Sequence, residues 1–329
     1  MFLFLSMNTQ IVYTLISSSN DIYLEQLWIS VYSLRMYNKQ VSVVVLTDTS
    51  TYEYMSNRKD LIKIIDDIKI VNVPCKYNNV QKSRYLKTTV RQHIKGKFLF
   101  IDTDTIITNN IEEIDNISCQ IACVPDLHTT FKDFPSRESV IELTKSIFEV
   151  DVSDSKFYFN SGVMLVDDNE LTHNFYESWH NNWEYSSCTK GVNTDQQSLI
   201  KTDKDYNYIL EPMSGIYNCQ ILGSIQYLYD AKIMHFFNAT WLSNMQCHPF
   251  FGKDIYMMLK KEQKISLILE NNIRNCKSLF PSPSMIITDE YFRFIFSAPF
   301  HNMYKLYHTN PTCYEVINFI IRIINKLFN

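Results

Sequence analysis

The chain has 329 residues, a formal net charge of −4 and only six glycines. No two glycines form G-x-G, which excludes the Gly-rich dinucleotide fingerprint and the G-x-x-x-x-G-K-[ST] phosphate loop. The mildly acidic balance argues against a nucleic-acid partner, since nucleic-acid binders usually carry a basic excess. A hydrophobic content of 46% is enough for one large domain or two ordinary ones.

Strand-length apolar runs alternate with helically periodic segments. Strands are predicted at 11–16, 41–46, 68–73, 97–101, 121–124, 159–166 and 232–234, and helices from an Asn20 cap through Leu34, at 81–93, 171–183 and 194–201. Because the strand runs are almost continuously apolar, we expect an α/β fold with a mostly parallel sheet covered by helices. Beyond about residue 250 the pattern becomes helical, with a Pro-bearing loop at 280–284.

The ends of the chain and its cysteines bear on location. No apolar run is long enough to span a bilayer. The start MFLFLSM is too short for a signal-peptide core and lacks a basic residue and a cleavage site, and Met7 is a second candidate start. Eight cysteines without a C-x-x-C pair indicate reduced, mostly buried thiols. These features predict a cytoplasmic protein.

The strongest candidate site lies in FLFIDTDTIIT, residues 98–108. A buried strand there delivers Asp102 and Asp104 to the carboxyl edge of the sheet, where ligands bind in open α/β folds. Their oxygens suit Mg²⁺ or Mn²⁺, which commonly bridges protein carboxylates and substrate phosphates. His235 follows a short strand in the same way and could complete an Asp-Asp-His site that favours Mn²⁺. A polar turn and a packed histidine are the alternatives.

Two further segments combine polar side chains with a buried strand or a helix start. Asn160 and Ser161 lie within the apolar strand YFNSGVMLVD, where Gly162 would let the backbone approach a ligand closely. Asp195 and Gln196 begin the predicted helix of NTDQQSLI, for which the cap would be one of the two preceding residues, 193 or 194. Taken alone, Asp195 could simply complement the helix dipole.

These motifs, in this order, resemble glycosyltransferase family 8, which includes glycogenin and bacterial lipopolysaccharide galactosyl- and glucosyltransferases. The segment YTLISSSNDIYLEQLWISVYSL (13–34) is also similar to the family's first strand and nucleotide-contacting loop. The resemblance covers about residues 9–245. It implies a GT-A type nucleotide-sugar-binding fold.

The resemblance also implies a metal site. Asp102, Thr103 and Asp104 match the family's D-x-D, and His235 matches the third protein ligand. Mn²⁺, or Mg²⁺, would then hold the diphosphate of a UDP-sugar.

Further roles follow from the same resemblance. Asn160 and Ser161 match positions near the donor sugar, and Asp195 and Gln196 match the D-Q pair that lies on its β face. Four residues fall where the family packs the uracil and ribose: Leu15, Ser17, Asn20 and Tyr23.

One segment departs from the family pattern. After the last strand the family commonly reads H-x-x-G-x-x-K-P-W, with the lysine on the diphosphate, whereas His235 is followed here by FFNATW. The family's basic residue in the helix before D-x-D is matched by Arg84 or Lys87, which lie on one helical face. These two residues, or Lys253, are the candidates to replace the missing lysine.

The resemblance implies a retaining, metal-dependent transfer of glucose or galactose from a UDP-sugar to a hydroxyl of a glycan or glycolipid, as in lipopolysaccharide or polysaccharide biosynthesis. One alternative is a haloacid-dehalogenase-like phosphatase, with Asp102 as nucleophile and the pair Asp167 and Asp168 as its acidic motif. The other is a catalytically impaired relative that only binds a nucleotide or glycan.

We expect residues 1–250 to form the GT-A-like domain and 251–329 a helical region that contacts a membrane or an acceptor. The segment 314–328 is apolar on most sides, with Arg322 and Lys326 four residues apart. It is too short to span a bilayer, but it could lie at the inner face of a membrane with its cations near anionic lipid. A helix docked on the core is the alternative.

Overall fold

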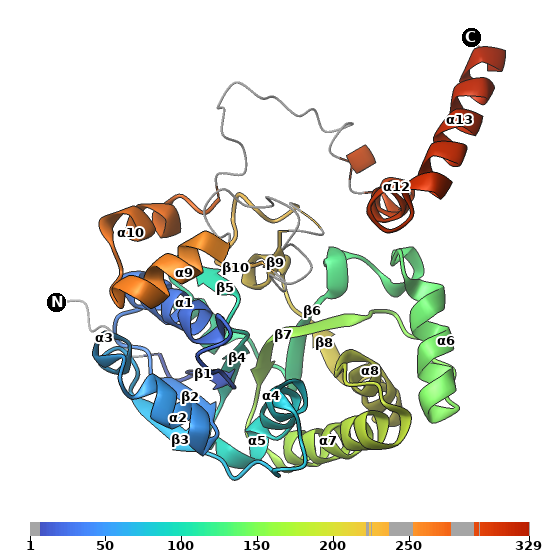
Figure 1. Cartoon of the computed structure of the whole chain (residues 1–329). Coiled ribbons are helices and arrows are strands. Elements are labelled where there is room, and N and C mark those ends of the chain that lie inside the picture. The colour runs from blue at the N-terminus through green and yellow to red at the C-terminus, as the bar shows by residue number, and fades with distance from the viewer. Residues whose placement is uncertain are drawn as a thin grey trace.

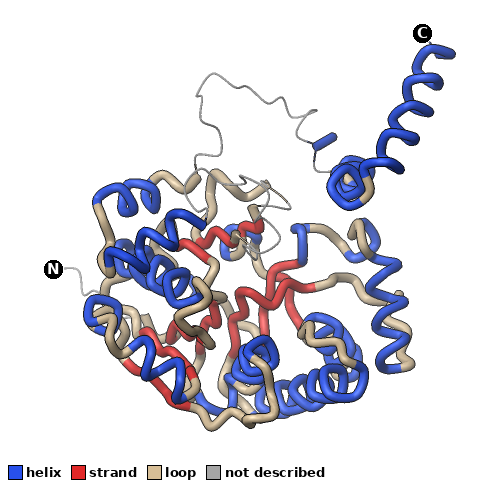
Figure 2. The backbone as a smooth tube through the Cα atoms, in the orientation of Figure 1, coloured by secondary structure: helices blue, strands red, loops and turns tan. Residues whose placement is uncertain are grey.

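The computed structural model describes residues 7–221, 224, 226–236, 253–277, 293–295 and 297–328. Two sheets form the centre of the molecule, and helices cover them (Figures 1 and 2).

The larger sheet has seven strands in the order β3-β2-β1-β4-β7-β6-β8. Pairing is parallel from β3 to β4 and between β6 and β8, and only β7 runs antiparallel to its neighbours. In sheet order the strands are β3 (Asp67–Ile70), β2 (Val43–Thr47), β1 (Gln10–Leu15), β4 (Phe98–Ile101), β7 (Phe159–Val166), β6 (Ile121–Pro125) and β8 (Leu210–Pro212). The prediction of a mostly parallel sheet is therefore confirmed.

The smaller sheet has three strands in the order β5-β10-β9: β5 (Thr105–Ile107), β10 (Ile233–His235) and β9 (Cys219–Gln220). β10 is antiparallel to β5, so that His235 lies opposite Thr105. Since β5 follows β4 after only three residues, the smaller sheet begins where the larger one ends.

Both faces of the larger sheet are apolar, which explains the continuous apolar runs in the sequence. In β1, Ile11 and Tyr13 belong to one buried cluster, whereas Val12 belongs to a second cluster on the opposite face. The first cluster includes α1 and the smaller sheet, and the second includes Leu86 of α4 and Trp179 of α7.

The helices of the described chain are α1 (Tyr23–Tyr37), α2 (Thr49–Met55), α3 (Lys59–Ile62), α4 (Asn79–Thr88), α5 (Val90–His93), α6 (Arg137–Phe148), α7 (Glu170–Lys190), α8 (Gln196–Asp205), α9 (Lys253–Glu262), α10 (Leu267–Arg274), α12 (Ala298–Thr309) and α13 (Pro311–Phe328). Leu259 of α9 and Leu269 of α10 are fully buried in the first cluster, so these two helices complete the core. By contrast, α12 and α13 stand away from the sheets (Figure 1). No helix among the described residues has the length and apolar character needed to cross a membrane.

Several local expectations are corrected. Asn20 does not cap the first helix, which begins at Tyr23 behind Ile22 without a side-chain cap. The predicted helix at 81–93 is divided into α4 and α5 at Thr89. The cap position of α8 is taken by Asp195 rather than residue 193 or 194. The 280–284 loop lies outside the described residues.

The prediction of mostly buried thiols is also wrong. Seven cysteines are described and all are free, but only three are buried: Cys123, Cys219 and Cys276.

Candidate active site

The two aspartates of the D-x-D segment lie at the junction of the two sheets. Asp102 comes directly after β4, and its backbone N–H donates to the carbonyl of Gly162 in β7 (2.7 Å). Asp104 directly precedes β5, and its carbonyl accepts from Phe236, the residue after β10. The antiparallel pairing of β5 and β10 therefore brings His235 to the two aspartates across a long separation in sequence.

Asp102, Asp104 and His235 form one candidate metal-ligand group. One ligand atom of each lies within 4.8 Å of the others. His235 Nε2 is 3.1 Å from Asp104 Oδ1, and the imidazole is almost fully buried while both carboxylates remain partly accessible. Two carboxylates and one imidazole are a donor set that fits Mn²⁺.

The charges of this group are coupled. Burial alone would raise the pKa of Asp104, but the adjacent His235, together with a backbone hydrogen bond and Lys87, lowers it. Burial likewise opposes protonation of His235, yet Asp104 raises the pKa of the imidazole. Burial raises the pKa of Asp102, although Lys87 partly counteracts it.

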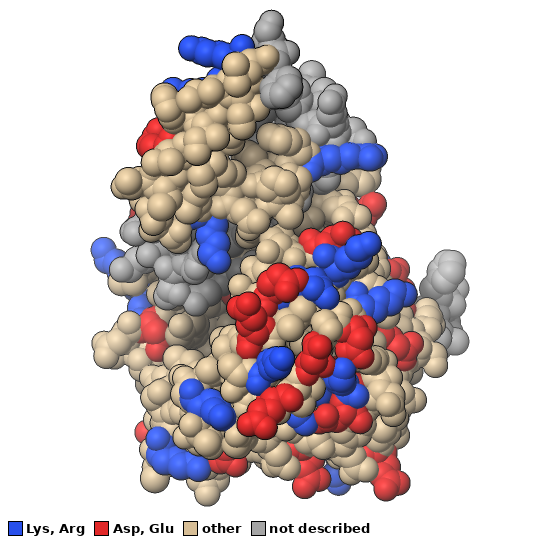
Figure 3. Space-filling model, turned by 90° about the vertical axis from the view of Figure 1, so that its right-hand side faces the viewer, with Lys and Arg blue, Asp and Glu red and all other residues tan. Residues whose placement is uncertain are grey.

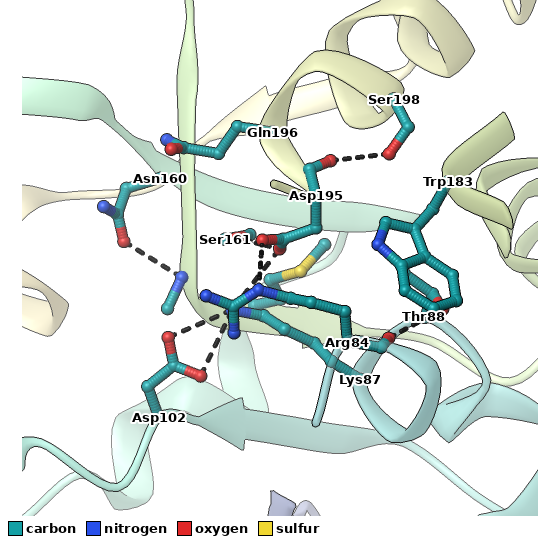
Figure 4. Close-up of polar contacts among 12 residues, drawn as sticks. Arg84, Lys87, Thr88, Asp102, Asn160, Ser161, Trp183, Asp195, Gln196 and Ser198 are labelled. Atoms are coloured by element: carbon teal, nitrogen blue, oxygen red, sulfur yellow. Dashed lines mark hydrogen bonds and ion pairs between the residues drawn. The ribbon is translucent and has the colours of Figure 1, made fainter. Parts of the chain in front are cut away.

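Two basic residues of α4 lie between Asp102 of this group and Asp195 (Figure 4). Lys87 Nζ lies 3.0 Å from Asp102 Oδ2 and 3.6 Å from Asp195 Oδ2, and Arg84 Nε lies 3.0 Å from Asp195 Oδ1. The i, i+3 spacing predicted from sequence thus places both cations on one face. They link the D-x-D segment to the start of α8.

Asp195 is buried, with a side chain only 6% exposed. Burial would raise the pKa of this carboxyl, but Lys87 and Arg84 together hold it well below its usual range. Ser161 Oγ donates a further hydrogen bond to Asp195 Oδ2 (2.7 Å). The backbone carbonyl of Asp195 accepts from Trp179 Nε1 (3.1 Å), which fixes the start of α8 against α7. An ionised carboxylate is therefore held rigidly beside the candidate metal group.

Asn160 and Gln196 contact a residue that the sequence analysis missed, Asp126. Asn160 Nδ2 donates to Asp126 Oδ1 (3.3 Å), and Gln196 Nε2 donates to Asp126 Oδ2 (3.2 Å). Asp126 comes two residues after the predicted strand 121–124, and directly after β6, so a rule that searches strand ends for carboxylates would have found it as well as Asp102. Asn218, which accepts from His235 and donates to Asn160, carries no comparable signal.

The backbone after Asp126 is strained. Leu127 and His128 both have left-handed conformations, with φ of 52° and 56°. Each non-glycine residue of this kind costs about 1–2 kcal/mol and usually appears where surrounding structure enforces it. Here Leu127 N–H donates to Gln220 Oε1 (2.6 Å), and His128 Nε2 donates to the Asn218 carbonyl (2.8 Å). The smaller sheet thus holds the turn that carries Asp126.

The residues predicted to contact the uracil and ribose occupy different environments. Leu15 is buried in β1, and Ser17 is engaged at the start of α1, where its Oγ accepts from Leu24 N–H (3.2 Å). Asn20 and Tyr23 are exposed, so two of these four positions are open to a ligand, and Thr103 of the D-x-D segment is half-buried.

A pocket of about 210 Å³ lies beside the Asp126 turn. Its lining combines aromatic rings (His128, Phe157 and Tyr227) and two threonines with apolar residues such as Val124 and Met213.

No protein-family model matches the chain, and no curated protein matches its sequence. Among solved structures, the apo form of mouse xyloside xylosyltransferase 1 aligns with a TM-score of 0.48 and 14% identity over 69% of this chain and 97% of that chain. The glycosyltransferase GlyE of Streptococcus pneumoniae TIGR4 aligns with a TM-score of 0.47 and 17% identity over 85% of this chain and 67% of that chain. Similarity at this level does not decide function, which has to be argued from the site.

Proposed function

We propose that the protein is a retaining, metal-dependent hexosyltransferase that moves glucose or galactose from a UDP-sugar to a hydroxyl of a glycan or glycolipid. The observation that carries the proposal is the convergence of Asp102, Asp104 and His235 at one sheet junction with Asp195, across the ammonium of Lys87. A nucleotide-sugar site needs two parts. The metal group would bind the diphosphate, and the rigid carboxylate of Asp195 would bind the sugar hydroxyls.

Asp102, Asp104 and His235 would hold the metal, which when bound stabilises the departing UDP as a Lewis acid. Arg84 adds a cation at the same place, with a side chain that is 34% exposed and therefore able to reach a phosphate. In this proposal Arg84 and Lys87 substitute for the family lysine missing after His235. The segment 237–241 that departs from the family pattern lies outside the described residues, as does the side chain of Lys253.

Asp195, Gln196 and Asn160 surround the proposed sugar position. The ionised Asp195 would accept hydrogen bonds from sugar hydroxyls, and the fixed dipoles of Gln196 and Asn160 would stabilise positive charge that develops at the anomeric carbon. An amide is a weak nucleophile, so we favour attack of the acceptor on the face that UDP leaves. The acceptor would enter through the pocket beside Asp126, whose aromatic lining suits a sugar ring.

The phosphatase alternative is not favoured by the geometry. It needs the acidic pair Asp167 and Asp168 near Asp102, at the carboxyl end of β4. Instead, Asp168 Oδ2 accepts from the backbone N–H of Gly96 (2.5 Å), which precedes the amino end of β4. The binding-only alternative is supported by the missing lysine. It predicts UDP binding without sugar transfer or hydrolysis.

The deciding experiment is a Mn²⁺-dependent hydrolysis screen across UDP-sugars, which needs no acceptor. We expect turnover of UDP-glucose or UDP-galactose by the wild type and its loss in Asp102→Asn and Asp104→Asn. Turnover that survives both substitutions would refute the site. Phosphate release from a generic phosphomonoester would favour the phosphatase.

For α13 we propose contact with an anionic membrane surface at the cytoplasmic side, which suits a glycolipid acceptor. Its apolar side chains are exposed to solvent, Phe319 at 63% and Leu327 at 75%. Figure 3 shows few charged side chains over the top of the molecule, where α12 and α13 lie, and many of both signs over the body below. The chain as a whole is acidic, yet residues 293–329 carry four basic side chains (Arg293, Lys305, Arg322 and Lys326) against Glu315 alone. Anionic lipid is complementary to that local charge. The division of the chain at residue 250 likewise remains a proposal.

A further inference from the structure

Five side chains form one continuous hydrogen-bonded chain across the candidate site: Gln196, Asp126, Asn160, Asn218 and His235. Its links are Gln196 Nε2 to Asp126 Oδ2 (3.2 Å), Asn160 Nδ2 to Asp126 Oδ1 (3.3 Å), Asn218 Nδ2 to Asn160 Oδ1 (3.0 Å) and His235 Nδ1 to Asn218 Oδ1 (3.0 Å). The chain connects the proposed sugar position to the proposed metal position.

The direction of each link toward His235 follows from one backbone group. Gly162 N–H donates to Asn160 Oδ1 (2.9 Å), so this end of the Asn160 amide has to be oxygen. Because this oxygen can only accept, the Asn218 atom bonded to it is the amino nitrogen, Nδ2. The other end of the Asn218 amide, Oδ1, therefore faces His235. An amide oxygen only accepts, so His235 Nδ1 carries a proton. The other ring nitrogen, Nε2, then faces Asp104 and is the atom that a metal would take.

The direction toward Gln196 is fixed in the same way. Gln196 Nε2 donates both to the Phe159 carbonyl (3.2 Å) and to Asp126 Oδ2. Both amino hydrogens are thereby used, because a backbone carbonyl can only accept. Among the described residues, no donor contacts Gln196 Oε1 and this oxygen is not a buried unsatisfied atom. It is therefore open to a ligand.

We propose that Asp126 and Asn218 are positioning residues: Asp126 turns the carbonyl oxygen of Gln196 toward the donor sugar, and Asn218 turns Nε2 of His235 toward the metal. This inference rests on the proposed function and adds two residues to it. Neither residue has to touch substrate. Each acts by choosing one of two orientations that an amide or an imidazole could otherwise adopt.

The surroundings of both residues show that their positions are enforced. Asn218 is fully buried in front of β9. The turn that carries Asp126 keeps two consecutive left-handed residues, Leu127 and His128, and hydrogen bonds from both reach Asn218 or Gln220. The smaller sheet therefore holds the two positioning residues in register with each other.

The test of Asp126 is Asp126→Asn. It replaces one of the two carboxylate oxygens, which accept from Asn160 and Gln196, by an amino group that can only donate. We expect kcat for UDP-sugar hydrolysis to fall roughly tenfold or more, while the Kd of UDP with Mn²⁺ changes less than about threefold. In a Gln196→Ala background, Asp126→Asn should add little. Additive losses, or an unchanged kcat, would overturn the role of Asp126. Asp133→Asn, an exposed change in the same loop, is the matched control.

The test of Asn218 compares two variants by Mn²⁺ binding, followed through the EPR signal of free Mn²⁺ without donor. Asn218→Leu removes the acceptor for His235 and should weaken Mn²⁺ binding roughly 10–100-fold. Asn218→Asp keeps the acceptor and should stay near the wild type. Equal weakening by both would mean a merely structural role. Asn38→Leu, at another buried asparagine whose amide bonds only backbone groups, controls for general damage.

The outcomes separate the two levels of the proposal. Wild-type turnover with unchanged variants overturns the positioning roles alone. Wild-type protein that binds neither Mn²⁺ nor UDP overturns the proposed function, and the positioning roles with it.

Discussion

The backbone of Gly162 lies directly against the imidazole of His235. A Cβ atom at residue 162 would lie 2.3 Å from Cε1 and 2.9 Å from Nδ1 of that ring, far inside van der Waals contact. The sequence analysis assigned the close approach at Gly162 to a ligand. The structure shows that the approaching group is a side chain of the site itself.

Gly162→Ala should therefore displace His235. We expect an overpacking cost of about 1–3 kcal/mol in the free energy of unfolding, together with a marked loss of Mn²⁺ affinity by EPR titration. Gly191→Ala is the control, because residue 191 has open space around it but a φ of +73°. That variant should lose stability through backbone strain and keep its Mn²⁺ affinity. If Gly162→Ala binds Mn²⁺ like the wild type, His235 is not a ligand.

Lys87→Met removes a buried cation from between two carboxylates. Lys87 is only 3% exposed, and its ammonium contacts Asp102 and Asp195. We expect the free energy of unfolding to fall by about 3 kcal/mol, since unpaired buried charge is costly. Mn²⁺ should restore part of that loss by neutralising Asp102, so the Mn²⁺-induced rise in Tm should exceed that of the wild type.

Lys82→Met tests the specificity of that rescue. Lys82 lies on the same helix but pairs with Asp48 (2.8 Å) rather than with a candidate metal ligand. Its loss should lower Tm without enlarging the Mn²⁺ effect. An equal Mn²⁺ effect in Lys87→Met and the wild type would show that Lys87 does not neutralise the metal-binding carboxylates.

Asp203 gives a prediction about pH. Burial raises the pKa of this carboxyl from 3.8 to about 7, although Leu210 N–H donates to it and partly lowers the pKa. Between these two values the folded state holds a proton that the unfolded state has released. The contribution of Asp203 to the free energy of unfolding should therefore decrease as pH rises from about 4 to 7, and level off above.

Asp203→Asn should flatten that decrease and stabilise the protein at pH 8, by up to about 4 kcal/mol. Asparagine can still accept from Leu210, so the hydrogen bond is kept. The measurement is urea unfolding at several pH values. Asp205→Asn, at an exposed position paired with Lys201, should leave the profile unchanged. A wild-type slope that survives in Asp203→Asn would assign the pH dependence to another group.

The membrane proposal is tested by two substitutions on opposite faces of α13. Ile320→Asp adds a negative charge to the apolar face, whereas Asn318→Asp adds the same charge about 200° away, on the polar face. In co-sedimentation with vesicles containing anionic lipid, we expect Ile320→Asp to weaken binding at least tenfold and Asn318→Asp only slightly. Equal weakening by the two substitutions would show that the added charge, and not its position on the apolar face, determines binding. Absence of wild-type binding would refute the proposal.

The fold was largely readable because burial on both faces leaves strands almost wholly apolar. Phe159–Val166 matches its predicted range fully. The short β8 and β9 left no such run, and α6 was missed despite its amphipathic pattern. Helix starts were harder to predict because caps depend on tertiary contacts. The start of α1 has no side-chain cap at Ile22, and its first N–H groups donate instead to Asp21 and Ser17, with no contribution from Asn20.

The candidate site was predicted where chain connectivity alone brings residues to one edge. Asp102 and Asp104 lie at a strand end, and the i, i+3 rule placed Arg84 and Lys87 together. Asn218 could not be predicted, since it lies in a loop, and its importance comes only from the two amide groups that it joins. Contacts that only tertiary packing creates leave no local pattern in the sequence, so they cannot be predicted from it.

The ligand group at the sheet junction has a consequence for how the molecule holds together. Asp102 comes from the end of the larger sheet, whereas His235 belongs to the smaller one. A bound ion would therefore cross-link the two sheets. It would slow hydrogen exchange at the amides of β5 and β10, which flank the ligands, far more than at those of β2 and β3. Metal occupancy could then be read from backbone exchange alone, before any sugar is transferred.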